Sequence, residues 1–337
     1  MKSRQRVKRA IHFRNPDRLP ISLAVLPATK LKYGRALEEI LATVPDDFGW
    51  HLLPDAKPEE FPAFYKKGKH YDEFGTLWQV ETPGMLGRPV EFPLACWSNY
   101  RNYRWPEPLA SPPRTKLYCA QMAGHDENFY ARAAWITFFE RMQLLRGPEN
   151  LMLDLAYKTK ELYRLRDDLL EFNLRWLDHW LMLELDGICF ADDWGTQNAL
   201  LISPQLWREF FKPVYQKMFA RVKEKGLDVH FHSDGYIMDI IPDLLELGVD
   251  VLNCQESLIG VDELGRQFAG KICFQTNLDQ QRIMPFASPD QVRAHILYVF
   301  DKLARLNGGL IASAEIGPDI PPENIRIMFK TFMEYVC

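Results

Sequence analysis

The chain has 337 residues, of which 47% are hydrophobic and 26% are charged, and its formal net charge is −4. These values are typical of a soluble globular protein with a large core, and the negative charge gives no electrostatic basis for binding nucleic acid. The six cysteines form no Cys-x-x-Cys pair, which favours reduced thiols and a cytosolic location. No apolar run follows the basic residues 1–6 or approaches the about 20 residues of a membrane helix. We therefore expect a cytoplasmic protein that does not bind membranes.

The N-terminal third of the chain has an irregular pattern. Residues 19–26 resemble a first strand of a sheet, and residues 129–135 resemble a second. Between them, residues 74–93 are rich in Gly, Pro and alternating aromatic residues, which predicts a β-hairpin, and residues 105–113 form a proline-rich connection. We expect the region around 50–115 to be an elaboration that covers one end of the main fold and contributes to substrate specificity.

From about residue 150 onward, apolar strands and helices alternate. The expected strands are residues 186–191, the segment around Val229, and residues 249–254, 272–275 and 310–313. The expected helices are residues 151–185, 203–225 and 237–247, a short helix from 261, residues 289–306, and a last helix from 321. Such alternation predicts an α/β fold with parallel strands. Because no glycine-rich phosphate turn follows any strand, we expect a single (β/α)8 TIM barrel over residues 1–337 rather than an open doubly wound sheet.

The segment Asp-Val-His-Phe-His-Ser-Asp-Gly at 228–235 is the most informative part of the chain. In a strand, the side chains of His230, His232 and Asp234 point to the same face. Imidazoles and carboxylates are rarely buried without partners, so these groups should meet a ligand, a metal or each other. The alternative is a pair of core histidines hydrogen-bonded to neighbouring carboxylates, followed by a simple turn.

Polar residues also follow the ends of the other predicted strands. They are Asp192 and Asp193, Asn253 with Gln255 and Glu256, Asn277 with Asp279, and Glu315. In a barrel, the loops after the carboxyl ends of the strands converge over the axis and carry the chemistry. Each residue also has a structural interpretation, as a helix cap or an ion-pair partner, and we expect Asp279 to be an N-cap.

Several short blocks occur in an order that resembles the uroporphyrinogen decarboxylase superfamily, which includes cobalamin-dependent methyltransferases. The most specific blocks are Asp-Asp-Trp-Gly-Thr-Gln at 192–197 and His-Ser-Asp-Gly at 232–235. The others lie at residues 3–7, 15–20, 139–150, 202–204, 212–213, 277–279 and 318–324. The resemblance runs nearly from end to end of the chain and implies a (β/α)8 barrel.

The resemblance implies two different reactions. Uroporphyrinogen decarboxylases carry an arginine-rich segment near the first strand that binds the many carboxylates of the porphyrinogen. The corresponding residues 23–33 contain two lysines and no arginine, and lysine does not supply the planar, bidentate fork of arginine. Decarboxylation of a porphyrinogen or another carboxylated substrate, in porphyrin metabolism, is therefore the second hypothesis. Asp192 would then match the aspartate of the decarboxylases' Phe-Asp-Ser-Trp block.

The methyltransferases of this superfamily use zinc held by a His-x-Cys pair and a later Cys or His. Here the pair is His232-x-Asp234, and the later position falls near Ala314, beside Glu315. Zinc accepts His, Asp and Glu ligands, so the resemblance implies a zinc or similar divalent site of His232, Asp234 and Glu315, with His230 as the alternative third ligand. Such a site favours an oxygen over a thiolate substrate. The motif of corrinoid-carrying proteins fails at Ser233, so the corrinoid is expected on a separate protein.

We therefore expect an enzyme that moves a methyl group from a small methylated or methoxylated substrate to a corrinoid protein, with metal assistance. The expected catalytic residues are Asp192, Asp193 and His230, and the expected substrate-binding residues are Trp194, Gln197, Gln255 and Asn277. The expected partners are the substrate, a corrinoid protein and a second copy of the chain as a homodimer. A third hypothesis is a barrel without catalysis that only binds a tetrapyrrole or a small acid.

Overall fold

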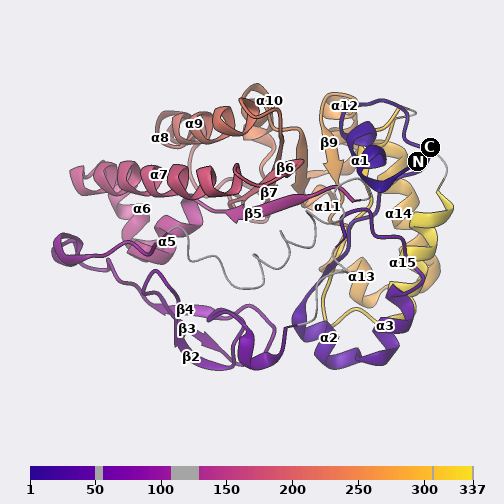
Figure 1. The fold of residues 1–337 in the computed structure, drawn as a ribbon, viewed down its shortest axis with the longest axis horizontal. Coiled ribbons are helices and arrows are strands. Elements are labelled where there is room, and N and C mark those ends of the chain that lie inside the picture. The colour runs from indigo at the N-terminus through magenta and orange to yellow at the C-terminus, as the bar shows by residue number, and fades with distance from the viewer. Residues whose placement is uncertain (50–55, 108–128, 306, 336–337) are drawn as a thin grey trace.

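The structure is a computed structural model that describes residues 1–49, 56–107, 129–305 and 307–335. Its centre is a parallel sheet of six strands in the order β10-β9-β8-β7-β6-β5 (Figure 1). The strands are β5 (Arg132–Ile136), β6 (Gly187–Ala191), β7 (Asp228–Ser233), β8 (Val251–Cys254), β9 (Cys273–Gln275) and β10 (Leu310–Ile311). A separate parallel pair is formed by β1 (Ala24–Val25) and β11 (Glu315–Ile316). The prediction of an α/β fold with parallel strands is confirmed.

The two edges of the six-stranded sheet are connected through short segments of extended backbone. The backbone N–H of Ser22 donates to the carbonyl of Ala312 next to β10, at 3.0 Å. The N–H of Asp47 donates to Ile21, and the N–H of Tyr130 next to β5 donates to Asp47, each at 3.0 Å. These bonds connect the two edges of the sheet in the order expected of a barrel, and we call this path the barrel circuit. The described residues contain no regular eight-stranded ladder. The first predicted strand, residues 19–26, is reduced to the two residues of β1 and a single bridge between Ile21 and Ala312.

The segment at Asp47 was not expected as part of the barrel circuit. The sequence pattern predicts residues 129–135 as the second strand, whereas the chain at Asp47 lies between Ile21 and Tyr130 in the circuit. Two acidic residues, Asp46 and Asp47, replace the apolar pattern that identifies buried strands, which explains the error.

Helices lie on the outside of the sheet, α7 to α10 over one part and α12, α14 and α15 over another (Figure 1). The helices are α1 (Ser3–Ile11), α2 (Pro27–Tyr33), α3 (Arg35–Leu41), α5 (Phe139–Arg146), α6 (Pro148–Tyr157), α7 (Lys160–Trp180), α8 (Pro204–Phe210), α9 (Lys212–Lys223), α10 (Ile241–Glu246), α11 (Glu256–Ile259), α12 (Val261–Phe268), α13 (Ile283–Phe286), α14 (Pro289–Leu303) and α15 (Pro322–Glu334). In the part of the chain that the structure describes, no helix is both long and apolar enough to span a membrane.

Two predicted helices are divided in the structure. The helix expected over residues 151–185 is interrupted at Lys158, whose φ of +51° ends α6. The helix expected from 203 to 225 is interrupted at Phe211, just before Pro213, which lacks the N–H that a continuous helix would use. The predicted N-cap is confirmed, because the Ser203 hydroxyl accepts a hydrogen bond from the N–H of Leu206 at 3.2 Å.

The predicted hairpin is present and has a third strand. The antiparallel sheet consists of β2 (Gly68–Tyr71), β3 (Leu77–Val80) and β4 (Arg88–Glu91). Gly84 connects this sheet to the first residues of α2, where a Cβ atom at Gly84 would lie only 2.4 Å from the backbone nitrogen of Ala28. Only glycine permits such close contact. The proline-rich connection expected at 105–113 lies mostly outside the described residues, and a single domain for the whole chain stays a prediction.

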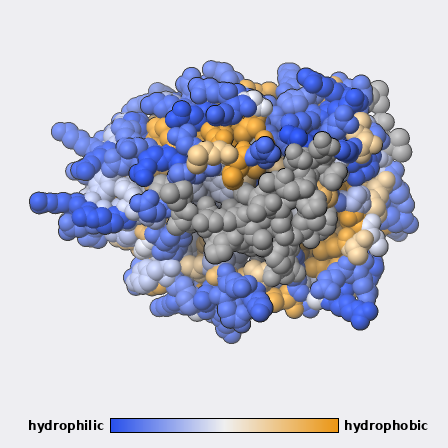
Figure 2. Space-filling model, viewed as in Figure 1, coloured by the Kyte–Doolittle hydropathy of each residue, from blue (hydrophilic) through white to orange (hydrophobic). Residues whose placement is uncertain are grey.

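Apolar side chains from these elements form one large core, and the face seen in Figure 2 is mostly hydrophilic at its periphery. A buried ion-pair network supports the barrel circuit at Asp47, whose side chain is fully buried. Its carboxylate accepts hydrogen bonds from Arg6 at 2.7 Å, from Arg18 at 2.8 Å, and from the backbone N–H of Ile21 at 2.8 Å. Arg6 also binds the half-exposed carboxylate of Asp17 at 2.6 Å. One carboxylate therefore connects α1 to the first strand segment.

We expect Asp47→Asn to lower the free energy of unfolding by roughly 3–5 kcal/mol, because it leaves two guanidinium groups without their buried partner. The matched control is Asp17→Asn, which removes the other, half-exposed partner of Arg6 and should cost only about 1 kcal/mol or less. Urea unfolding followed by circular dichroism measures both. Equal effects of the two substitutions would contradict the structural role of Asp47.

Candidate active site

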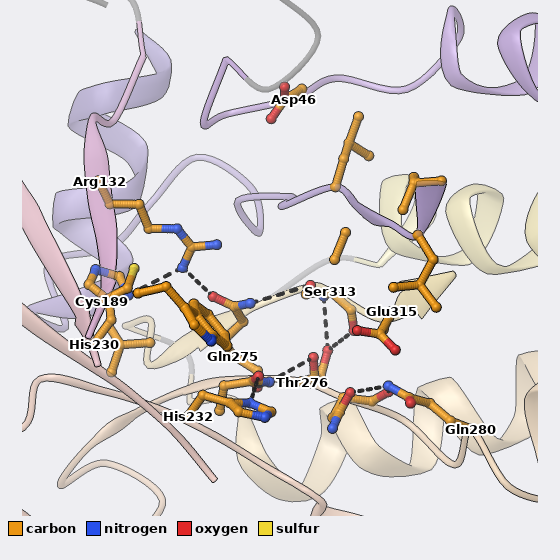
Figure 3. A pocket seen from close by; sticks show the side chains of 18 of the residues that line it. Asp46, Arg132, Cys189, His230, His232, Gln275, Thr276, Gln280, Ser313 and Glu315 are labelled. Atoms are coloured by element: carbon orange, nitrogen blue, oxygen red, sulfur yellow. Dashed lines mark hydrogen bonds between the residues drawn. The ribbon is translucent and has the colours of Figure 1, made fainter. Parts of the chain in front are cut away.

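A cavity of about 1050 Å³ opens at the carboxyl ends of the parallel strands. The side chains labelled in Figure 3 come from β5, β6, β7, β9 and β11, from the loops after β9 and β10, and, for Asp46, from the segment after α3. Five of the predicted site residues line this cavity, namely His230, His232, Asp234, Asn277 and Glu315. The other five, Asp192, Asp193, Trp194, Gln197 and Gln255, are not part of its lining. The fold therefore brings about half of the proposed site residues to the cavity.

The imidazole of His232 has one nitrogen fixed by the protein and the other directed at carboxylates. Its Nδ1 lies 2.6 Å from the amide oxygen of Asn253, which only accepts, so Nδ1 carries the proton. The amide of Asn253 is itself oriented, because its nitrogen donates to the carbonyl of Gln275 at 2.8 Å. The other nitrogen, Nε2, lies 3.6 Å from one oxygen of Asp193 and 3.6 Å from one oxygen of Asp234.

Asp193, His232 and Asp234 form a compact cluster whose potential ligand atoms all lie within 4.8 Å of one another. An imidazole whose other nitrogen donates to an oxygen acceptor is the usual arrangement of a histidine ligand. Two carboxylates and one neutral imidazole suit a zinc or similar divalent ion. The residues therefore fit the metal that the resemblance implies. Asp193, expected as a catalytic residue, takes the place in this cluster that was expected for Glu315.

Further carboxyl groups face the cluster. Burial and the neighbouring Asp193 carboxylate raise the pKa of Asp234, which also accepts a hydrogen bond from Asn277 at 3.3 Å. The pKa of Glu315 is raised by desolvation on its cavity side and by the carboxylate of Asp234, although the side chain is partly exposed to solvent. Burial, followed by the carboxylates of Asp192 and Asp193, raises the pKa of Glu140 to about 9. Crowded carboxyl groups at the end of a cavity favour a bound cation or a shared proton.

Asp192 lies behind the cavity and is fully buried. Its carboxylate accepts hydrogen bonds from the backbone N–H groups of Phe138 and Glu140, at 2.9 and 2.8 Å, and from the hydroxyl of Tyr215 at 2.6 Å. Burial raises its pKa to about 7, and these donors oppose the increase. The contacts hold the first turn of α5. Its expected catalytic role has no contact with the cavity to support it.

The other predicted residues outside the lining have structural positions. Trp194 is fully buried and stacks on Phe139 with 4.1 Å between the ring centroids. Gln197 is exposed to solvent. Gln255 accepts a hydrogen bond from the N–H of Gly235 at 3.1 Å, and so holds the loop that carries Asp234. Substrate contact stays an untested prediction for all three, and Asn277 is the predicted substrate-binding residue that lines the cavity.

His230 lies one strand layer deeper than His232. Its Nε2 lies 2.9 Å from the hydroxyl of Tyr130, which donates to Asp228, and its Nδ1 lies 3.3 Å from a nitrogen of Arg132. Burial and the nearby guanidinium lower the pKa of His230 to about 3, so the imidazole is neutral. Because both nitrogens have protein partners, the structure gives His230 no free atom for catalysis.

Arg132, Gln275 and Ser313 also line the cavity and were not expected as site residues (Figure 3). Gln275 connects the other two, because it accepts a hydrogen bond from Arg132 and donates to the Ser313 hydroxyl at 3.5 Å. The available signal was an arginine in an otherwise apolar strand, since an unexplained buried charge is rare. Gln275 and Ser313 lie inside their predicted strands and carried no comparable signal.

The sequence comparisons agree with this site. Residues 133–335 match the family model described as Uroporphyrinogen decarboxylase (URO-D). The chain belongs to this family. The matched part contains the whole Asp193–His232–Asp234 cluster. Uroporphyrinogen decarboxylases of Prochlorococcus marinus, strains NATL1A and NATL2A, are each 27% identical to the chain over 180 residues. These matches cover 52% of the chain and 49% of each relative, so they span about half of the curated relatives' length.

A solved structure of a methyltransferase from Methanosarcina mazei has the same fold. It superposes with a TM-score of 0.69 over 99% of both chains, at 14% sequence identity. This identity shows a shared fold and not a shared reaction. The matching family model and the curated relatives are those of enzymes, and the superfamily expected from the sequence motifs is confirmed.

The loop that carries Asn277 depends on a buried carboxyl group. Glu256 accepts hydrogen bonds from the backbone N–H of Asn277 at 3.1 Å and from that of Leu278 at 2.6 Å. Leu278 has a φ of +59°, a conformation that such bonds must support. Burial outweighs these donors and raises the pKa of Glu256 to about 7.

We expect this carboxyl group to make stability depend on pH. Between the unfolded pKa of about 4.5 and the folded value of about 7, the native state keeps a proton that the unfolded chain releases. Its contribution to stability is therefore present below pH 4.5 and is lost as the pH rises toward 7. Relative to wild type, Glu256→Gln should gain stability across this window, by at most about 1.4 kcal/mol per pH unit. Urea unfolding at pH 5, 6, 7 and 8 tests this, and a difference independent of pH would contradict it.

Proposed function

We propose that this protein is a metal-assisted methyltransferase that moves a methyl group from a small methylated or methoxylated substrate to a corrinoid carried by a separate protein. The main support for this proposal is the cluster of Asp193, His232 and Asp234 at the strand ends. Two of its members line a cavity large enough for a small aromatic molecule. The similar solved structure, a methyltransferase from Methanosarcina mazei, agrees with this proposal through the fold alone.

The roles of the residues follow from their positions. A divalent ion held by Asp193, His232 and Asp234 would supply Lewis acidity toward the oxygen that loses the methyl group. Asn253 holds the imidazole of His232 through Nδ1, so that Nε2 faces the cluster. Asn277 lies beside Asp234 and can donate to the substrate. In the transfer, the substrate oxygen keeps the bonding electron pair and then needs a proton. Glu315, whose pKa is raised, lines the cavity as an acid that can supply it.

The charges of the cavity disfavour a porphyrinogen. In the described part of the chain, its lining contains two cations, Lys30 and Arg132, and four carboxyl groups, Glu38, Asp46, Asp234 and Glu315. Such a lining repels a substrate with many carboxylates unless arginines neutralise them. The family name and the curated relatives favour decarboxylation, so it stays the second candidate. It requires a cationic cavity that the described residues do not form.

We expect the purified protein to bind about one equivalent of zinc. His232→Ala, Asp193→Ala and Asp234→Ala should each abolish tight binding, and Asn253→Leu should weaken it about 10–100-fold, because the imidazole loses its orientation. His230→Gln is the matched control, since His230 lies outside the cluster, and should leave the stoichiometry unchanged. Elemental analysis and calorimetry measure these effects. Absence of any bound ion after reconstitution with excess zinc would reject the metal site.

We expect the protein to transfer methyl groups from methoxylated aromatic compounds to added reduced corrinoid. The change in the absorbance of the corrinoid measures this transfer. Asp234→Ala should lower the rate at least about 100-fold. Uroporphyrinogen should give no coproporphyrinogen, which fluorescence after oxidation detects. Formation of coproporphyrinogen by the wild type at an enzyme-like rate would establish the decarboxylase instead. If neither reaction occurs over a broad panel while a tetrapyrrole binds tightly, a binding protein is the correct description.

A further inference from the structure

Arg132 on β5 is a buried cation without an anionic partner. It is 8% exposed, and its guanidinium group points into the cavity (Figure 3). It contacts Gln275 at 2.5 Å, Ser22 at 2.9 Å and His230 at 3.3 Å, and all three partners are neutral. Among the described residues, no carboxylate forms an ion pair with it, and its Nε–H has no acceptor.

The two other deeply buried arginines behave differently. Arg6 and Arg146 are each 7% exposed, and both pair with buried carboxylates, those of Asp47 and Asp154, each at 2.7 Å. A buried charge without a partner is strongly unfavourable. The ring of Phe48, 4.3 Å from the guanidinium carbon of Arg132, offsets only part of this cost. The missing negative charge at Arg132 is therefore best supplied by a ligand in the cavity.

We propose that Arg132 binds the carboxylate of the substrate, and that the substrate is a small monocarboxylate whose reacting oxygen lies at the Asp193–His232–Asp234 cluster. The identity of the reacting end rests on the proposed function, whereas carboxylate binding rests on Arg132 itself. A single guanidinium surrounded by neutral groups matches one negative charge. The carboxyl groups elsewhere in the lining oppose a phosphate dianion or a polycarboxylate.

The strand geometry gives the length of this substrate. The Arg132 guanidinium contacts His230, and His232 lies two residues further along β7 on the same face. Two residues of a strand span about 7 Å. A carboxylate at Arg132 and an oxygen at the cluster should therefore be separated by roughly this distance, as in a para-methoxylated benzoate. The ring of Trp135, with its centroid 5.4 Å from that of His232, provides an aromatic surface at the same level.

Calorimetry on the zinc-reconstituted protein tests the proposal with matched acid and amide pairs, namely benzoate, 4-hydroxybenzoate and 4-methoxybenzoate with the corresponding benzamides. At least one acid should bind more tightly than its amide, and Arg132→Met should weaken that acid about 10- to 100-fold with little effect on the amide. If no acid binds more tightly than its amide, the proposal is wrong. The proposal is also wrong if Arg132→Met binds the acid with the affinity of the wild type while His232→Ala no longer binds it. The carboxylate would then lie at the cluster.

Thermal unfolding separates loss of the ligand contact from loss of the fold. Arg132→Met removes an unpaired buried charge, so the unfolding midpoint without ligand should stay unchanged or rise. The matched control, Arg146→Met, leaves Asp154 buried without its partner and should lower the midpoint by several degrees. A midpoint that falls equally in both variants would show that Arg132 is a structural residue and overturn the proposal.

The proposal and the proposed function fail in different ways. Arg132-dependent binding of carboxylates without any methyl transfer would reject the methyltransferase and keep the anion site. Methyl transfer that proceeds equally well from 4-methoxybenzamide and 4-methoxybenzoate, and is unchanged in Arg132→Met, would keep the methyltransferase and reject the anion site.

Discussion

The parallel register between β6, β7 and β8 is the constraint on which the candidate site depends. In this register, Ala191 pairs with His232, and His232 pairs with Asn253. Asp192 and Asp193, which follow β6, therefore lie beside the end of β7. On the other side, the amide of Asn253 reaches Nδ1 of His232. A slip of one residue would turn every side chain of β7 to the opposite face. Since β6 is buried at all of its five positions, the surrounding core leaves the sheet no alternative register.

The cavity is divided into two layers by the alternation of β7. At the level of His230, a guanidinium group lies among neutral hydrogen-bonding groups, and the low pKa of His230 prevents a second positive charge there. At the level of His232, carboxyl groups crowd the strand ends and suit a cation. Opposite electrostatic preferences at the two levels favour a ligand with an anionic end and a reacting end, held in one orientation.

The sequence predicted most of this fold because its strands are apolar and bounded by glycine or polar residues. It predicted the shared face of His230 and His232 from strand periodicity alone. It could not predict the pairing at Asp47, where two carboxylic acids occupy a position that the hydrophobic pattern assigns to a loop. The apolar strand around Arg132 was a signal that its charge is unusual, but the absence of an ion-pair partner is a property of the folded molecule and not of the neighbouring sequence.

The neighbours Asp192 and Asp193 show what separates structural from functional polar residues at a strand end. Consecutive residues of an extended chain point in opposite directions, so one carboxylate enters the core and the other faces the cluster. Backbone donors and Tyr215 satisfy Asp192 completely, as expected for a buried group that supports the fold. By contrast, Nε of Arg132 has no hydrogen-bond partner among the described residues, and Nε2 of His232 has only two carboxylates at 3.6 Å. A polar atom that the fold leaves unsatisfied can bind a ligand where its residue also lines the cavity, as His232 and Arg132 do.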